Sequence, residues 1–230
     1  MMRIFVINPN TSHNLTDHIR RELERIKRPE TVVTVENPTH GPASIESAYD
    51  EVLAGPEIME LVRKANAERY NAIVLACFAD PALDAAREIS DIPVIGIEEA
   101  TLHIAAMLGH KFSILTSSER RVSTRELHVR LRNVEDAFAS APVLAMSVLE
   151  MDADPEKAKA RSVELARRAI EEDGAEVIIL GCAGLAGYAE EIARRTGAIV
   201  LDPTAVAFKI AEALVDLGLS HSKVRRYAAP

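Results

Sequence analysis

The sequence has no tryptophan, and aromatic residues make up only 4% of its 230 positions. Because 48% of the residues are hydrophobic, a real core is still possible, filled by alanine, valine, isoleucine and leucine. The chain also lacks an apolar run of the ~20 residues that a membrane helix needs, and its N-terminus carries no secretory signal. We therefore expect a soluble, cytoplasmic protein with no membrane partner.

An excess of positive charge is missing as well. Lysine and arginine number 27 against 35 aspartates and glutamates, which gives a net charge of -8. The basic residues are scattered through helical patterns and form no patch. Nucleic acid is therefore not an expected partner.

Only two cysteines are present, Cys77 and Cys182. Two cysteines in a chain of this length do not make a disulfide scaffold, and a reducing compartment would keep them as thiols. One interpretation is that both are buried core residues, as free cysteines usually are. Their positions favour a functional interpretation, because each follows an apolar run and stands before a helical pattern.

The first cysteine closes the run Ala72-Ile73-Val74-Leu75-Ala76, whose unbroken apolar character is typical of a strand buried on both faces. Asp80-Pro81 then predicts an N-cap and the first residue of a helix. Ligands of open α/β sheets bind at the carboxyl ends of strands, and a helix N-terminus favours negative charge. We therefore expect the Cys77 thiol to lose its proton readily and to act as a nucleophile or a base.

The same pattern returns once, where 176–180 leads into Gly181-Cys182. The cysteines are 105 residues apart (182 − 77), and at this offset the next apolar runs, 93–96 and 198–201, align without a gap. Strands and helices alternate throughout, so we expect an α/β fold of two similar doubly wound (flavodoxin-like or Rossmann-like) parallel-sheet lobes related by internal pseudo-symmetry. The expected lobes are residues 1–97, completed by a C-terminal helix and tail at about 204–230, and residues 98–203.

The local patterns also predict individual elements. The expected strands cover 3–7, 31–36, 72–76, 93–97, 111–115, 143–149, 176–180 and 198–201, and the expected helices include 12–27, 58–70, 98–108, 155–172, 185–195 and 203–217. The basic tail, 220–230, is expected to be loosely held.

Polar loops follow the first strand of each half. Asn8-Pro9-Asn10-Thr11-Ser12 ends the first one, and Thr116-Ser117-Ser118 stands in the corresponding place of the second half. Helix caps explain part of this composition. Four polar residues around one proline exceed what a cap requires, so Asn10 and Thr11 are candidates for contacting a polar ligand. The irregular loop 37–46, with two prolines and a glycine, is a candidate lid or pocket wall.

Two glycines, Gly181 and Gly184, flank the second cysteine. They either permit close packing, or they leave the amides of Ala183 and Gly184 free to stabilise a developing oxyanion. If the strand ends of the two lobes meet across a cleft, two thiols approach one small molecule from opposite faces. That arrangement suits proton exchange at a carbon next to a carbonyl, with no cofactor and no metal.

Several segments together resemble the hydantoin racemases of the Asp/Glu/hydantoin racemase superfamily, over residues 3–217. They are Ile7-Asn8-Pro9-Asn10-Thr11-Ser12, Gly41-Pro42-Ala43-Ser44-Ile45-Glu46, Ala76-Cys77-Phe78-Ala79-Asp80-Pro81, Pro93-Val94-Ile95-Gly96-Ile97-Glu98-Glu99-Ala100 and Leu180-Gly181-Cys182-Ala183-Gly184. Leu185 departs from this pattern, where methionine is expected, and this affects only pocket shape.

The resemblance implies cofactor-independent racemisation with Cys77 and Cys182 as the acid/base pair, and a homo-oligomer. It further implies that Asn10, Ser117 and the backbone near the cysteines hold the carbonyls and nitrogens of the ring. The expected substrate contacts are Asn10, Thr11, Ile45, Phe78, Ala79, Asp80, Thr116, Ser117, Ala183 and Gly184.

Three alternatives stay open. An allantoin racemase would use the same pair of cysteines, and polar groups near Ile45, Phe78 and Leu185 would favour it. A decarboxylase of this superfamily needs only one cysteine, so the second argues against it. A two-lobed binding protein without catalysis gives no reason for paired thiols.

Overall fold

The computed structural model describes residues 1–230, except for the side chains of residues 148, 149 and 152, and the chain forms two compact units. Unit 1 comprises Met1–Ile97 and Ala207–Pro230, and unit 2 comprises Glu98–Val206. Each unit is built on one parallel sheet of four strands. The expected α/β class with two parallel sheets is confirmed.

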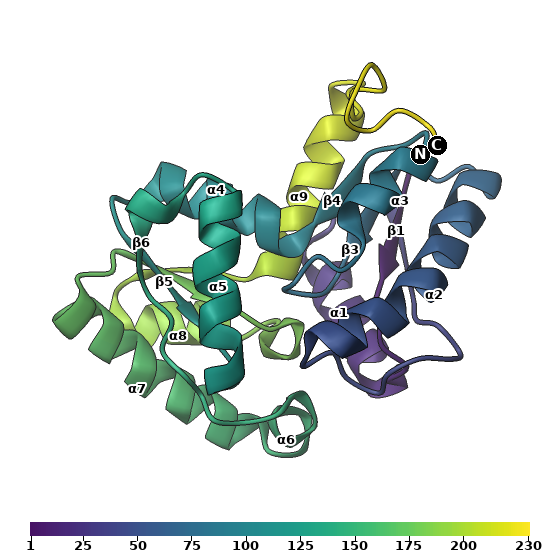
Figure 1. Cartoon of the computed structure of the whole chain (residues 1–230). Coiled ribbons are helices and arrows are strands. Elements are labelled where there is room, and N and C mark those ends of the chain that lie inside the picture. Colours follow the sequence, from purple (N-terminus) through teal and green to yellow (C-terminus); the bar gives the residue numbers. More distant parts are fainter. The chain divides into compact units, whose positions relative to one another are not determined.

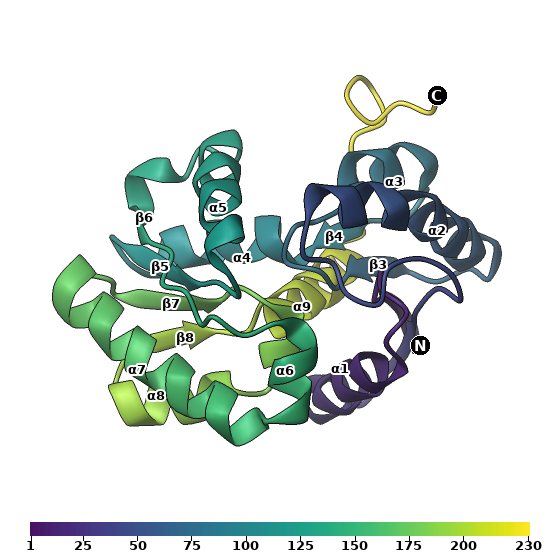
Figure 2. The same ribbon diagram turned by 60° about the horizontal axis from the view of Figure 1, so that its bottom comes forward.

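The sheet of unit 1 has the order β2-β1-β3-β4. Its strands are β1 (Met2–Ile7), β2 (Thr31–Glu36), β3 (Ala72–Leu75) and β4 (Val94–Gly96), and its helices are α1 (His13–Ile26), α2 (Ala48–Ala67) and α3 (Leu83–Ile89). In Figure 2, α2 and α3 cover one face of this sheet and α1 lies on the other. Buried apolar side chains of β1 and β3 form one core with those of α2, including Phe5, Ile73 and Ile58.

The sheet of unit 2 has the corresponding order, β6-β5-β7-β8. Its elements are β5 (Phe112–Leu115), α5 (Glu119–Leu131), η1 (Glu135–Ala137), β6 (Phe138–Ser140), α6 (Val148–Ala153), α7 (Pro155–Asp173), β7 (Val177–Leu180), η2 (Ala183–Leu185), α8 (Ala189–Thr196) and β8 (Ile199–Leu201). Helices α7 and α8 pack on one face of the sheet, and α5 lies on the other (Figures 1 and 2). Since both sheets repeat one strand order, the chain builds the same parallel core twice.

Two helices carry the chain from one unit to the other. The first residue of α4 (Ile97–Leu108) belongs to unit 1 and the rest to unit 2. Helix α9 (Pro203–Asp216) begins in unit 2 and continues in unit 1 from Ala207. Over the described residues, no helix combines the length and the apolar character needed to cross a bilayer.

The strand expected at 143–149 is wrong. The second strand of unit 2 is β6, three residues long, and the expected segment contributes only a single bridge from Val143 to Thr116. Ala145 has a left-handed backbone (φ 56°), which breaks an extended run, and α6 then begins after the capping box formed by Ser147 and Glu150. The apolar pattern of this segment therefore marks a packed connection and not a strand.

Two helix starts also differ from expectation. Helix α2 begins at Ala48, ten residues before the expected 58, because Ser47 caps it and the helix continues through Pro56. The helix expected at 185–195 is shorter, since Gly187 (φ 80°) separates η2 from α8. Pro56 thus did not interrupt a helix, whereas Gly187 did.

The C-terminal tail is not loosely held, contrary to expectation. Nε2 of His221 lies 2.9 Å from the backbone nitrogen of Val94 and 2.8 Å from its oxygen. Nζ of Lys223 donates to the carbonyl of Arg87 at 2.5 Å, and Nη1 of Arg87 donates to the hydroxyl of Tyr227 at 3.1 Å. The basic side chains therefore bind backbone oxygens of α3 and fix the tail beside the edge strand β4.

Candidate active site

Cys77 lies two residues beyond the last residue of β3, in a tight turn. Its amide donates to the carbonyl of Leu75 at 3.1 Å, and its own carbonyl accepts from the amides of Ala79 (2.8 Å) and Asp80 (3.0 Å). The thiol forms no disulfide and is half-buried. Because β3 stands between β1 and β4, this turn lies at the carboxyl edge of the sheet of unit 1.

The helix expected to begin at Asp80-Pro81 begins later. Asp80 has a left-handed backbone (φ 47°), Ala82 (φ 56°) is the N-cap, and α3 is only seven residues long. The predicted effect of a helix dipole on the Cys77 thiol is therefore wrong for this turn, because the dipole acts only within the first turn of a helix.

The carboxylate of Asp80 is buried against the backbone of β4. A Cβ placed on Gly96 would lie 2.4 Å from Oδ2 of Asp80, so only glycine leaves room for this side chain. Asp80 therefore ties the Cys77 turn to the end of β4. Its predicted role as a substrate contact stays a prediction.

Cys182 occupies the matching place in unit 2, two residues beyond the last residue of β7. Its amide donates to the carbonyl of Leu180 at 2.8 Å, and the amide of Gly184 donates to its Sγ at 3.4 Å. This thiol also forms no disulfide and is half-buried. The amide of Gly184, expected to be available to an oxyanion, is therefore directed at the sulfur.

Gly181 is explained by close packing. Its amide donates to the carbonyl of Leu115 at 2.9 Å, and a Cβ on it would lie 2.5 Å from that same oxygen. Register confirms the correspondence between the units, since Leu115 pairs with Leu180 as Ile7 pairs with Leu75. The two cysteines therefore stand at equivalent points of two equivalent sheets.

The loop after β1 holds Asn10 in one orientation. Its Oδ1 accepts from Nδ2 of Asn8 at 3.0 Å and from the amide of Ser12 at 2.9 Å. Thr11 donates its amide to the carbonyl of Pro42 at 3.0 Å, which ties this loop to the irregular loop 37–46. With Oδ1 occupied, the Nδ2 group of Asn10 is the donor that a ligand can use.

Three buried side chains, two of which the sequence did not single out, carry unsatisfied oxygens. Within the described residues, Oδ1 of Asn8, Oγ1 of Thr116 and Oγ1 of Thr204 have no hydrogen-bond partner. Of these only Thr116 was predicted to be a site residue, and only from its neighbourhood. Asn8 and Thr116 directly follow β1 and β5, and Thr204 lies three residues beyond β8. Buried polar atoms without partners are uncommon, which marks these strand ends as candidate ligand contacts.

The remaining predicted residues divide by burial. Ile45 is packed in the core of unit 1 and Leu185 in that of unit 2, so packing alone accounts for their apolar character. Phe78, Ala79 and Ala183 are buried in the turns beside the cysteines, and Ser117 is half-buried after β5. Apart from the core residues Ile45 and Leu185, the predicted residues of each unit lie at the carboxyl edge of that unit's sheet.

A buried ion cluster lies where α4 leaves β4. Glu98, 2% exposed, accepts from Nη1 of Arg125 at 2.5 Å, and its other oxygen lies 2.6 Å from Nδ1 of His128. Burial by itself raises the pKa of Glu98, but the charge of Arg125 and the hydrogen bond from His128 outweigh it, and the pKa is lowered. Glu98 therefore stays ionised and joins α4 to α5.

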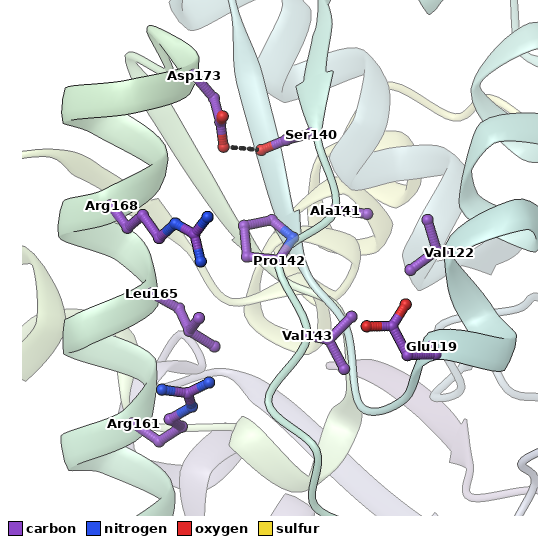
Figure 3. Close-up of a pocket in the computed structure, with 10 residues that line it drawn as sticks. All are labelled: Glu119, Val122, Ser140, Ala141, Pro142, Val143, Arg161, Leu165, Arg168 and Asp173. Atoms are coloured by element: carbon purple, nitrogen blue, oxygen red, sulfur yellow. Dashed lines mark hydrogen bonds between the residues drawn. The ribbon is translucent and has the colours of Figure 1, made fainter.

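One pocket of unit 2 lies apart from the predicted residues. Its volume is about 370 Å³, and it is formed by α5, the segment after β6 and α7 (Figure 3). Arg161, Leu165 and Arg168 line one wall, Glu119 and Val122 the other, and Oγ of Ser140 donates to Asp173 at 2.6 Å. Neither Cys182 nor any other predicted residue lines it. Across the described residues no group of three or more His, Cys, Asp or Glu side chains is placed to hold a metal ion.

Comparisons with known proteins agree with this geometry. A hydantoin racemase from Pseudomonas sp. (strain NS671) is 39% identical over 229 residues, which cover 100% of this chain and 92% of that protein. The solved structures of an allantoin racemase from Pseudomonas fluorescens (38% identity, TM-score 0.95) and of an allantoin racemase from Klebsiella pneumoniae (35% identity, TM-score 0.97) match 100% of this chain. The matches cover 97% and 94% of those two chains. The sequence profile of the Asp/Glu/Hydantoin racemase family matches residues 4–211. The chain therefore belongs to the Asp/Glu/Hydantoin racemase family.

Proposed function

We propose that this protein racemises 5-substituted hydantoins without a cofactor, with Cys77 and Cys182 as its acid and base. The observation that carries this proposal is the equivalent position of the two thiols, which form no disulfide and each lie two residues beyond a central strand of their own sheet. Two similar units that each supply one such thiol suit a reaction at one carbon from two faces. The relationship to hydantoin racemases supports the same substrate class.

The mechanism needs only the two sulfur atoms and a polarised ring. One thiolate removes the proton from C5, the C–H electron pair moves into the adjacent carbonyl, and a planar enolate forms. The other thiol then donates its proton to the opposite face, and the electron pair returns to C5. The two cysteines have exchanged protonation states, and the substrate has changed hand.

Polar groups at the same sheet edges would hold the ring. The Nδ2 group of Asn10 is oriented to donate, because its Oδ1 is occupied by Asn8 and Ser12. Thr116 offers a buried hydroxyl, and Ser117 lies beside it. Each well-placed donor on the developing oxyanion lowers the barrier by about 3 to 4 kcal/mol.

Allantoin racemisation is the second candidate, since the two solved relatives at 35% and 38% identity are allantoin racemases. The same thiols would act on a ring that carries a ureido group. Ile45 and Leu185 do not decide between the two substrates, because both side chains are core residues. The residue left to test is Phe78, which would favour an apolar substituent.

We further propose that the two units are separate folding lobes, and that the protein is a cytoplasmic homo-oligomer. The division of the chain at Ile97 and Ala207 supports the two lobes. Light scattering of the purified protein measures the subunit number, and a mass of one 25.1 kDa chain would contradict the oligomer.

Polarimetry with L- and D-5-alkyl, 5-aryl and ureido hydantoins tests the substrate. Racemisation of alkyl or aryl hydantoins is expected, and activity on allantoin alone would favour the second candidate. Cys77→Ala and Cys182→Ala should each abolish racemisation, while either variant can still exchange the C5 proton of one enantiomer with deuterated solvent. Val224→Ala, at an exposed tail position, is the control. Full racemase activity in either cysteine variant would rule out the two-base scheme.

A further inference from the structure

The pocket drawn in Figure 3 lies within unit 2 and has walls that differ in charge. Helix α7 forms one wall with Arg161, Leu165 and Arg168, whose spacing of four and three residues places them on one face of the helix. Helix α5 forms the opposite wall with Glu119 and Val122. Two guanidinium groups therefore stand on one side of the pocket and a carboxylate on the other.

Both arginines keep donors for a ligand, although each is paired with a glutamate of its own helix. Arg161 uses Nη1 for Glu164, and Arg168 uses Nε for Glu172, each at 2.7 Å. Among the described residues, Nη1 and Nη2 of Arg168 and Nη2 of Arg161 have no hydrogen-bond partner. In Figure 3 both side chains extend from α7 toward the segment 140–143. Arg168 can therefore bind a carboxylate through two parallel hydrogen bonds.

The two carboxylates of the pocket differ in their partners. Oδ2 of Asp173, the last residue of α7, accepts from Oγ of Ser140 at 2.6 Å, and this hydroxyl also lies 2.8 Å from Oγ of Ser113. The carboxylate of Glu119, the first residue of α5, has no hydrogen-bond or ion-pair partner within the part of the chain that the structure describes. It points toward Val143 in Figure 3. Glu119 is therefore the carboxylate that a bound cation can use.

Apolar side chains line the space between these charged groups. They are Leu165 on α7, Val122 on α5, and Pro142 and Val143 in the connection that follows β6. Leu165 is buried, and the other three are half-buried. With a volume of about 370 Å³, the pocket has the size of a small-molecule site. The best match is a ligand with an apolar middle and opposite charges at its two ends.

We propose that this pocket binds a zwitterion of the ω-amino acid type, with its carboxylate on Arg168 and Arg161 and its ammonium group on Glu119. A simple carboxylate is repelled by Glu119, and a simple amine is repelled by the two guanidinium groups. A ligand that carries both charges satisfies both walls. Because Cys182 does not line the pocket, this is a second site of unit 2, and it does not depend on the proposed racemase function.

Four five-carbon compounds test the two charges separately. Binding of 5-aminopentanoate, pentanoate, pentylamine and norvaline to the whole protein is followed by NMR titration, with the amide shifts of 140–143 and 161–168 as the reporters. We expect 5-aminopentanoate to bind about fivefold more tightly than pentanoate or pentylamine, which is the contribution of one exposed ion pair. Norvaline, an isomer with adjacent charges, should lack this advantage. High salt should reduce the advantage, since the charged side chains are exposed or half-buried. Equal affinities at low salt, or unchanged shifts at these amides, would overturn the proposal.

Substitutions at the two walls assign the ends of the ligand. Glu119→Gln should lower the affinity for 5-aminopentanoate to that for pentanoate, whose own binding should become tighter as the repulsion is removed. Arg168→Gln should weaken both compounds. Arg63→Gln, the matched control, should change neither, since this exposed arginine of unit 1 also pairs with a glutamate of its own helix, Glu60 at 2.7 Å.

A preference for 5-aminopentanoate that survives Glu119→Gln would contradict the assigned site. Glu119, Arg168 and Arg63 are all exposed, so each variant is expected to fold. Because the titration follows amide shifts and not turnover, a failed racemase assay leaves its outcome unaffected.

Discussion

The two units share a strand order and a cysteine position, yet they fix their sheets by different means. In unit 1 side chains bind the edges, where Nη2 of Arg20 donates to the carbonyl of Val35 at 2.8 Å and His221 binds the backbone of Val94. In unit 2 the buried Glu98 cluster joins two helices. The apolar strands therefore specify the repeated sheet, while each unit has its own polar contacts from distant residues.

The largest expected effect comes from breaking the buried cluster of unit 2. Glu98→Ala leaves the guanidinium of Arg125, whose side chain is 3% exposed, without its carboxylate. Removing one partner of a buried pair costs about 3 to 5 kcal/mol, so unfolding in urea should occur at clearly lower concentration. Hydrogen exchange of α4 and α5 would locate the loss.

Glu99→Ala is the matched control on the same helix. Glu99 lies 3.2 Å from Nη1 of Arg132, and both side chains are about one-fifth exposed. Its loss should cost about 1 kcal/mol or less. Equal effects of the two substitutions would show that burial of Glu98 contributes nothing.

The second pair of substitutions tests the close approaches beside the two cysteines. Gly181→Ala puts a Cβ 2.5 Å from the carbonyl oxygen of Leu115, and Gly96→Ala puts one 2.4 Å from the carboxylate of Asp80. The backbone of Leu115, in the central strand β5, cannot move away from the new methyl group, whereas the side chain of Asp80 can rotate. We expect about 2 to 3 kcal/mol of destabilisation for Gly181→Ala and about 1 to 2 for Gly96→Ala. The reverse order in thermal or urea unfolding would contradict this reasoning.

The sequence predicted the repeated fold because its signal is local. Unbroken apolar runs such as 72–75 and 177–180 are typical of strands buried on both faces, and the constant offset of 105 residues between the two halves predicted two sheets. The strand expected at 143–149 failed, because Ala145 takes a left-handed backbone that no local pattern indicates. Helix α2 was predicted too short, because its Pro56 is tolerated inside the helix.

The site was predictable only in part. Both cysteines and the loop of Asn10 could be found from their places at strand ends. The contact of Asp80 with Gly96 could not, since it depends on a positive φ and on a strand 16 residues away (96 − 80). The unsatisfied oxygen of Asn8 was missed for a similar reason, because burial of a polar atom without a partner is a property of packing.

A smaller effect is expected on acidification, because each unit holds a buried carboxylate with a lowered pKa, Glu98 in unit 2 and Glu212 in unit 1. Burial by itself raises the pKa of Glu212 in unit 1. Hydrogen bonds from Lys209, from the amide of Arg28 and from Thr31 outweigh this effect, so the pKa is lowered. A carboxylate whose pKa is lowered in the folded protein stabilises the fold at pH values above its ordinary, unfolded pKa. This stabilisation is lost as the pH falls through the pKa of the folded state.

Glu212→Gln should therefore flatten the acid dependence of unit 1, and Glu98→Gln that of unit 2, in hydrogen exchange measured from about pH 7 downward. Glu24→Gln, whose side chain is half exposed, is the control. If neither substitution changes the dependence of hydrogen exchange on pH in its own unit, the two carboxylates are not the source of that dependence.

The smallest effect is expected at the edge of β4. His221→Ala removes the hydrogen-bond partner of the Val94 amide, Nε2 of His221 at 2.9 Å, while Nε of Arg87 still donates to the Val94 carbonyl at 3.1 Å. Loss of one such hydrogen bond costs about 1 kcal/mol, so exchange of the Val94 amide should accelerate about fivefold.

Val224→Ala, at an exposed position of the same tail, should leave exchange of the Val94 amide unchanged. Arg20 of α1 bonds the backbone of β2, whereas His221 of the tail bonds the backbone of β4. Deletion of 220–230 should therefore also accelerate hydrogen exchange at Val94, but it should not accelerate exchange in β2. Equal acceleration in both strands would mean that the tail stabilises the whole unit and does not act at this edge.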